Sequence, residues 1–451
     1  MKYRLVVIAA TLFAVFLNSC KSSSTDAPAV NSSWGSLQQK VITPVCTGCH
    51  TAGSDYALQS GLVLTSDVAY ANLVGVAAHN TDAHNDGILR VKVGSADSSL
   101  LYMKLHGLPQ GKNYGSPMPL GYKPLSVGQL KFIDEWIAAG APSTGVVADA
   151  SLLDDTTQSP PPTFAALPPP SPGQGYQMHL DSFTIANNFE REIFVYKKLG
   201  NPTDIYVNRI QTRMRENSHH FILYTFDPSM PSSMLPKYNV VRDLRNPDGS
   251  DNGNVITAME YHVFLGGSTT PDFDYFFPPG TALRIPANTA VDMNSHYVNY
   301  TGAPITGEVY ANLYTVPQSQ VTHVAQTLLW PQTNLNLPAH KETVITTDNM
   351  NNGTGAIPLY FIMLTSHTHA RGEKFRMLFK GKPGDARTGT VLYESTDWAH
   401  PLIKNLDTPL VINPGEGITT EVTYYNGTDQ DITFGFTSKD EMDILIGYYY
   451  F

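Results

Sequence analysis

A proline-rich stretch limits how this chain can fold, because it separates two regions with different sequence patterns. The segments Ser159-Pro160-Pro161-Pro162 and Leu167-Pro168-Pro169-Pro170 lie within it. We expect residues 143–175 to form a stiff, extended linker. Such a linker would tether the region before it to the rest of the chain without a rigid connection. Separate domains are therefore predicted on either side.

The composition fits a folded protein of several domains. The chain has 451 residues, of which 42% are hydrophobic and 15% charged, so it can bury sizeable cores. Its 35 glycines, 32 prolines and 24 tyrosines favour a turn-rich β structure. The net charge of −10 argues against a nucleic-acid partner.

The first residues resemble a bacterial lipoprotein signal. Lys2 and Arg4 precede an apolar run, Leu5 to Leu17, that is too short to span a bilayer comfortably. The run ends in Leu17-Asn18-Ser19-Cys20, which resembles the motif whose cysteine is lipidated. The resemblance implies that residues 1–19 are removed and that residues 20–31 tether a lipid anchor on Cys20. This would place the protein in a bacterial cell envelope, on the periplasmic or outer face of the outer membrane. An ordinary cleaved signal peptide is the alternative, and it also implies export.

The segment Cys46-Thr47-Gly48-Cys49-His50 has the Cys-x-x-Cys-His spacing of covalent haem c attachment. In that chemistry two thiols add to the haem vinyl groups and the adjacent histidine becomes an axial iron ligand. A redox dithiol is the alternative reading. Each of the three cysteines falls in a motif with its own chemistry, so no structural disulfide is expected.

Residues 32–142 resemble a small, all-α class I cytochrome c domain. Gly115-Ser116-Pro117-Met118-Pro119 resembles the loop that carries the second axial ligand, here Met118, whereas Met103 lies in a helical pattern and is expected to pack in the core. Ser126 predicts a helix N-cap. Apolar residues then recur at helical spacing until Gly140, which predicts a stop: Val127, Leu130, Ile133, Trp136 and Ile137.

From Tyr176 onward the pattern is β, with Pro and Gly between strand-like segments. A faint repeat aligns Tyr297, Asn299 and Thr301 with Tyr424, Asn426 and Thr428. We interpret it as two related β-sandwiches, residues 176–318 and 319–451, although chance similarity between two strand–turn–strand units is the alternative.

Two histidines follow a buried-strand pattern that ends at Leu364. On a strand, residues two apart share a face, so His367 and His369 would direct two imidazoles to one place. Two imidazoles on one face are a natural start to a transition-metal site.

Residues 176–451 resemble the type II copper, ascorbate-dependent monooxygenases, which include peptidylglycine α-hydroxylating monooxygenase and dopamine β-hydroxylase. The resemblance rests on His367-Thr368-His369 and three further stretches, Asn217-Ser218-His219-His220, Asn294-Ser295-His296 and Asp440-Glu441-Met442, in this order. It implies jelly-roll-like sandwiches that hold two copper ions. His219, His220 and His296 match the electron-transfer copper (CuH). His367, His369 and Met442 match the oxygen-binding copper (CuM) and would be the catalytic set. Neighbours His219 and His220 would point oppositely on a regular strand, so a shared copper needs a local distortion there.

At two positions the chain differs from the residues with which the family binds its substrate. The peptide-processing enzymes have an arginine where this chain has Thr365 and a tyrosine where it has Ile446; the family's disulfide cysteine is Asp443 here. The substrate contacts therefore do not carry over. Five further histidines match no ligand position and are expected to be surface or hydrogen-bonding residues: His179, His262, His323, His340 and His400.

The combined resemblance predicts an exported monooxygenase that hydroxylates a C–H bond with dioxygen. Its electrons would come through haem c from ascorbate or a redox protein, and its substrate, a small molecule or a peptide, is open. One alternative is a non-catalytic haem and copper protein for electron transfer or copper handling. A second is a carbohydrate-binding or adhesion protein with relic ligands.

Overall fold

The computed structural model describes residues 31–451 except 110, 111, 113, 121, 159–163, 247 and 436–438. The expected signal, the lipidation site Cys20 and nearly all of the tether lie outside the described residues. Within them, no helix is both long enough and apolar enough to cross a membrane.

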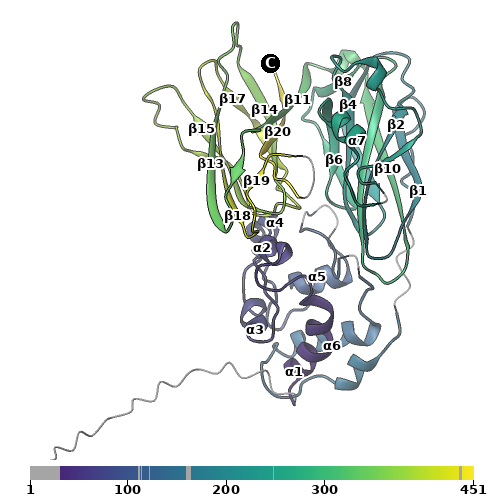
Figure 1. Cartoon of the computed structure of the whole chain (residues 1–451), viewed down its shortest axis with the longest axis vertical. Coiled ribbons are helices and arrows are strands. Elements are labelled where there is room, and N and C mark those ends of the chain that lie inside the picture. The colour runs from purple at the N-terminus through teal and green to yellow at the C-terminus, as the bar shows by residue number, and fades with distance from the viewer. Residues whose placement is uncertain are drawn as a thin grey trace, which may run out of the picture.

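The first region of the chain is helical and the remainder is β-rich, with sandwich-like sheets (Figure 1). The helical segments before residue 155 are α1 (Ser33–Leu37), η1 (Gln38–Cys46), α2 (Asp55–Ser60), α3 (Ala69–Leu73), α4 (Thr81–Asn85), α5 (Leu100–His106), α6 (Val127–Ala138) and η2 (Ala150–Asp154). Short helical segments within the β-rich region are η3 (Ser232–Met234), α7 (Gly253–Met259) and η4 (Gln318–Gln320).

The predicted helix after Ser126 is confirmed as α6. The Ser126 side chain accepts from the Gln129 amide while the Gln129 side chain accepts from the Ser126 amide, a capping box. Phe132 and Trp136 are fully buried against the apolar side chains of α1. Burying this face is what holds a 12-residue helix in place.

The expected linker is not extended throughout. Its residues 150–154 form η2, and Leu153 is buried in the helical core. The Asp155 carboxylate accepts from the Gly128 amide at the start of α6. Further on, Leu167 is buried and its carbonyl accepts from Gln177. Leu153 before residues 159–163 and Leu167 after them thus pack against the regions that the linker joins.

The strands of the β-rich region in chain order are β1 (Gly175–Ile185), β2 (Phe189–Lys198), β3 (Ile205–Met214), β4 (Ser218–Phe226), β5 (Val241–Asp243), β6 (His262–Ser268), β7 (Asp272–Phe276), β8 (Thr281–Ile285), β9 (Ala290–Asn299), β10 (Ile305–Val316), β11 (His323–Pro331), β12 (Asn336–Leu337), β13 (Lys341–Met350), β14 (Leu359–His367), β15 (Gly372–Lys380), β16 (Val391–Ser395), β17 (Lys404–Ile412), β18 (Gly417–Asn426), β19 (Ile432–Thr433) and β20 (Ile444–Tyr450). They form four sheets among the described residues, the smallest of which pairs β12 with β19. A sheet of five strands runs β5-β2-β9-β4-β6, and one of four strands runs β13-β18-β15-β16. Facing them, a nine-stranded sheet runs β1-β10-β3-β8-β11-β20-β14-β17, with β7 beside β3.

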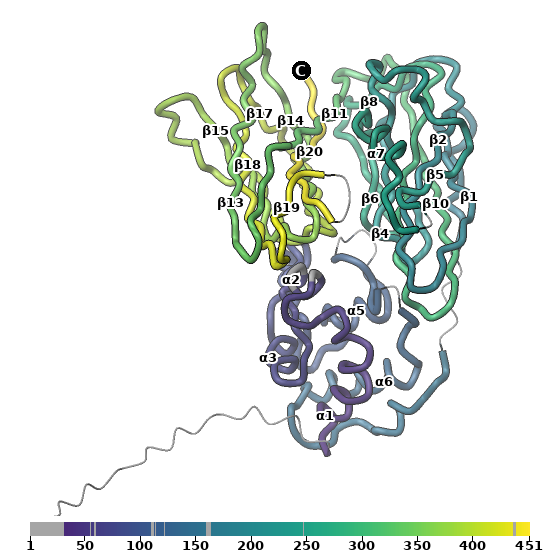
Figure 2. Tube along the Cα trace, viewed as in Figure 1, coloured from purple at the N-terminus to yellow at the C-terminus, as the bar shows by residue number. Residues whose placement is uncertain are grey.

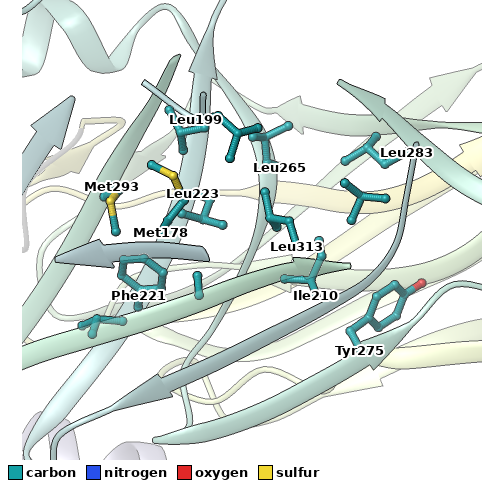
Figure 3. Packing of buried hydrophobic residues seen from close by; sticks show 14 of the residues in the cluster. Met178, Leu199, Ile210, Phe221, Leu223, Leu265, Tyr275, Leu283, Met293 and Leu313 are labelled. Atoms are coloured by element: carbon teal, nitrogen blue, oxygen red, sulfur yellow. The ribbon is translucent and has the colours of Figure 1, made fainter. Parts of the chain in front are cut away.

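The nine-stranded sheet joins the two halves. Strands β8 and β11 pair in parallel, from His323 opposite Thr281 to Ala325 opposite Leu283. The core of the first half includes Phe221, Leu223 and Met293 (Figure 3), and it extends to Met363 and Tyr448 of the second half. The halves therefore share a sheet and some of their core.

The sequence repeat corresponds to matching turns. Asn299 at the end of β9 is fully buried, and its side chain accepts from the amide and hydroxyl of Thr301. Asn426 at the end of β18 is equally buried and accepts from the amide and hydroxyl of Thr428. The alignment therefore identified two turns with the same hydrogen bonds.

The helical region lies against both β halves (Figures 1 and 2), contrary to the expectation of a loose tether. The Asn80 amide donates to Asp397 at 3.1 Å, and the Thr396 hydroxyl donates to the His79 carbonyl at 3.2 Å. Tyr122 stacks on Tyr300 of the first half, with ring centroids 5.8 Å apart. The helical region is therefore docked on the β-rich region through polar and aromatic contacts.

Candidate copper and haem sites

A local distortion brings His219 and His220 to the same place. The pairing of β4 with β9 shifts register between Ser218 and His220, which leaves His219 as an extra residue. Asn217, just before the strand, has a φ of 66°, in the left-handed region. The distortion that a shared copper requires is therefore present, and His220 pairs directly with His296 on β9.

Three imidazoles converge there. Ligand atoms of His219, His220 and His296 all lie within 4.8 Å of one another. Nδ1 of His219 is 3.3 Å from Nδ1 of His220. Nε2 of His220 lies 2.8 Å from the Asn294 side-chain oxygen, and Nε2 of His296 lies 2.6 Å from the Glu190 carboxylate. Each of these two rings thus has one nitrogen held by an acceptor, which leaves Nδ1 for a metal.

The charges around this His219 set favour a cation. Burial and the neighbouring histidines hold the pKa of His219 well below its usual value, so this imidazole is neutral and able to bind a metal. Burial opposes charge on His296, but its hydrogen bond to Glu190 and the charge of Glu192 outweigh burial and raise its pKa. Burial likewise opposes ionisation of Glu192, yet His220 and His296 lower its pKa. Two ionised carboxylates therefore lie behind the imidazoles.

His367 and His369 meet at the end of β14. Their ring centroids are 5.3 Å apart and the rings are nearly perpendicular. Burial and then the neighbouring His369 lower the pKa of His367 to about 3, which keeps this ring neutral. Strand β14 pairs with β20 up to His367 opposite Ile444, so continuing that antiparallel register sets His369 opposite Met442. Met442 is buried, with 6% of its surface exposed.

A buried carboxylate fixes the backbone of two of the three proposed ligands His367, His369 and Met442. The fully buried side chain of Glu441 accepts hydrogen bonds from the backbone amides of both His369 and Met442. Tyr424 on β18 donates to the Met442 carbonyl at 2.8 Å, and Nδ1 of His369 lies 3.0 Å from the Asp440 carbonyl. Nε2 of His369 is the nitrogen left for a metal. The donor set of two imidazoles and a thioether suits copper, because the soft sulfur favours Cu(I).

A large cavity in the helical region brings together the proposed haem ligands. About 180 Å³ of it is accessible to water, and Cys46, Cys49, His50 and Met118 all line it. Nδ1 of His50 lies 3.0 Å from the Leu62 carbonyl, which leaves Nε2 for iron. Both thiols are free, and the lining is mostly apolar, as a porphyrin requires. Met103 instead packs in a small separate cluster with Leu100 and other apolar side chains.

The cavity that His50 and Met118 line also reaches the His219 set. His219, Tyr300, Asp397 and His400 of the β-rich region line the same cavity as His50. Nε2 of His400 is 2.7 Å from the Ser116 hydroxyl, two residues before Met118. The His400 and His219 rings lie 6.4 Å apart. One buried histidine thus connects the Met118 loop with the His219 set.

The residues that support these ligands were not predicted from the sequence. Glu190 and Glu192 belong to no motif, and only the register of β2 against β9 sets them beside His296. Glu441 and Asn294 lie inside the ligand motifs but had no expected role. His400 was expected to be a surface or hydrogen-bonding residue; it is a hydrogen-bonding residue, but it is buried and its bond to Ser116 crosses the interface, which the sequence did not predict. Among the other histidines without a ligand role, His262 is held by Asp292 and His179 by Glu308.

Neither a protein-family model nor a curated protein sequence matches the chain. Among solved structures, the chain resembles the STIV MCP at 10% identity and a TM-score of 0.28, over 61% of this chain and 97% of that one. It resembles PNGase F, a glycosylasparaginase from Flavobacterium meningosepticum, at 9% identity and a TM-score of 0.22, over 61% and 94%. Similarities this weak carry no argument about what the chain does.

Proposed function

We propose that this chain is an exported, lipid-anchored copper monooxygenase with its own haem c domain. The helical region would be a cytochrome c domain, and the β-rich region would consist of two jelly-roll-like sandwiches that hold one copper each. The observation that carries the proposal is the adjacency of two donor sets. The three imidazoles of His219, His220 and His296 lie at the wall of a cavity that also contains a Cys-x-x-Cys-His motif and Met118.

The proposed reaction inserts one oxygen atom of dioxygen into a substrate C–H bond and releases the other as water. It consumes two electrons and two protons from an external donor, such as ascorbate or a redox protein. When bound, copper at the His367 set supplies oxygen activation, while copper at the His219 set and the haem supply electron transfer.

The protein's own residues perform three tasks in this scheme. Glu190 and Asn294 orient His296 and His220 through hydrogen bonds to their outer nitrogens. Glu441 fixes the backbone at both His369 and Met442. The hydrogen bond between His400 and Ser116 holds the haem cavity against the His219 set, so that electrons can cross a short interface.

Metal analysis of the mature protein, combined with its visible spectrum and oxygen uptake, tests the proposal. We expect two coppers and one iron per chain, a low-spin c-type haem spectrum, and oxygen uptake coupled to substrate loss. Met118→Ala should remove the weak near-infrared Met-to-iron band of the oxidised protein and leave the haem attached, whereas Met103→Ala should retain the band. Zinc bound tightly in place of copper would contradict the proposal.

A non-catalytic haem and copper protein is the second candidate, favoured because Thr365 and Ile446 do not match the family's substrate contacts. Copper and haem without any oxygen uptake in the presence of reductant would support it.

A further inference from the structure

A second cavity lies between the two β halves, beside His367. About 90 Å³ of it is accessible to water, enough for several water molecules or a small ligand, and part of it is open to solvent. One wall is the face of β14 and β20 that carries Met363, Thr365 and His367 opposite Tyr448 and Ile446. The opposite wall comes from the first half and includes Ile222 and Phe264.

The lining of this cavity carries no carboxylate, ammonium or guanidinium group among the described residues. Aliphatic and aromatic side chains dominate it, and the polar side chains are His367 and a few hydroxyls. An ionised ligand would lose its water here without gaining a counter-ion, which is strongly unfavourable. A neutral, mainly apolar ligand has no such penalty.

One buried hydroxyl in the cavity is available to a ligand. Ser366 and Ser268 also line it, but the Ser366 hydroxyl contacts the Tyr393 hydroxyl and that of Ser268 bonds to Thr270. Thr365 is 8% exposed, and its Oγ1 makes no close hydrogen bond among the described residues; the Tyr393 hydroxyl, which already contacts Ser366, is its polar neighbour. Thr365 stands two positions before His367 on the same strand, so both side chains face the cavity.

From this arrangement we propose that the enzyme acts on uncharged, predominantly apolar small molecules. The substrate carries one neutral hydrogen-bonding group, which Thr365 Oγ1 recognises next to the His367 set. The inference rests on the proposed function and adds its substrate class. The reaction remains balanced: a C–H bond, dioxygen, two electrons and two protons give an alcohol and water.

Space for this ligand depends on Gly266 of β6. A Cβ atom there would lie 2.7 Å from Ile210 Cδ1 and 3.3 Å from the Tyr448 hydroxyl. The Tyr448 hydroxyl donates to the Leu265 carbonyl at 2.6 Å, and this hydrogen bond joins the two walls of the cavity. The absence of a side chain at position 266 keeps this end of the cavity open.

Three probes that share one ring test the charge preference: 2-phenylethanol, phenylacetate and 2-phenylethylamine, which are neutral, anionic and cationic at about pH 7.5. Their binding to copper-free protein with its haem attached is measured by ligand-observed NMR and calorimetry. We expect 2-phenylethanol to bind at least about tenfold more tightly than either charged probe, because each charge would be buried without a partner.

Variants at position 365 test whether the Thr365 hydroxyl recognises the ligand. Thr365→Val keeps the shape and removes the hydroxyl, so it should weaken 2-phenylethanol about fivefold and leave ethylbenzene unchanged. Thr365→Arg should instead make phenylacetate the preferred probe. Thr346→Val, at an exposed threonine on β13, is the matched control and should change neither affinity.

Preference for either charged probe in the wild-type protein, binding that does not respond to Thr365→Val, or binding of no probe at all would overturn the inference. Copper analysis of the same preparation distinguishes failure of this inference from failure of the proposed function. Selective binding of 2-phenylethanol by protein that takes up no copper would refute the monooxygenase but leave the cavity assignment intact.

Discussion

The imidazole of His296 keeps Nδ1 available for a metal because Glu190 holds its other nitrogen. A histidine ligand with such a partner has a fixed ring orientation and a more basic free nitrogen. The Glu190 carboxylate accepts from Nε2 at 2.6 Å, and Asn294 plays the same role for His220. In the proposed copper site, these two acceptors would orient two of the three histidines.

Glu190→Gln is therefore expected to weaken copper binding at the His219 set by about 10–100-fold, because the amide is a poorer acceptor than the carboxylate. Competition with a chromophoric Cu(I) chelator measures the affinity of each site. Glu394→Gln, at an exposed glutamate paired with Arg376, is the control and should not change it. Equal copper affinity in both variants would mean that Glu190 does not support the ligand.

The bulge in β4 illustrates what the sequence could and could not predict. Adjacent histidines that share a metal require a distortion, so its existence followed from the resemblance that assigns His219 and His220 to one copper. Its form depends on the pairing with β9. His219 is the extra residue of the bulge, and Asn217 just before the strand has the left-handed conformation. The α6 helix and the Asn299 and Asn426 turns were predictable because their signals are local. Glu190 and His400 were not, because long-range pairing and docking bring them to the sites.

Asn217→Val should destabilise this bulge. A β-branched residue costs about 1–2 kcal/mol in the left-handed region, where asparagine and glycine are tolerated. We expect a lower free energy of unfolding by that amount, weaker copper binding at the His219 set, and an unchanged His367 set. Chemical denaturation and copper titration measure these effects.

Asn217→Gly is the matched variant, since glycine adopts the same backbone conformation without strain. It should retain copper binding at the His219 set. If valine and glycine at position 217 behave alike, backbone conformation there does not position His219.

At the scale of the whole molecule, His79 is half-buried where the helical region meets Thr396 and Asp397. Burial lowers the pKa of His79; Asp397 and a hydrogen bond to Thr396 oppose the shift, whereas Arg90 and His84 act in the same direction as burial. A histidine whose pKa is lowered in the folded protein contributes stability above its free pKa and loses it as the pH falls. The folded structure around His79, including its contacts with the β-rich region, should therefore be less stable below about pH 6.5.

Limited proteolysis between the helical and β-rich regions at about pH 7.5 and about pH 5.5, on either side of the free histidine pKa, measures this loss. Faster cleavage is expected at the lower pH. His79→Gln should reduce the pH dependence, and His340→Gln, at an exposed histidine, should retain it. Cleavage that accelerates equally in all three proteins would assign the pH dependence to other groups.

In the proposed function, docking also sets the route of electrons through the molecule. His219 lies at the wall of the cavity that His50 and Met118 line, and His400 contacts both Ser116 and the His219 ring. Mixing fully reduced protein with dioxygen in a stopped-flow instrument should therefore show haem reoxidation at a rate independent of protein concentration.

His296→Ala should slow this phase of haem reoxidation strongly, because it removes a ligand of the first acceptor. His400→Phe, which keeps a ring but loses the hydrogen bond to Ser116, should slow it on the order of tenfold, whereas His340→Phe should not. A rate that rises with protein concentration, or one that neither His296→Ala nor His400→Phe changes, would mean that the haem delivers its electrons to another partner.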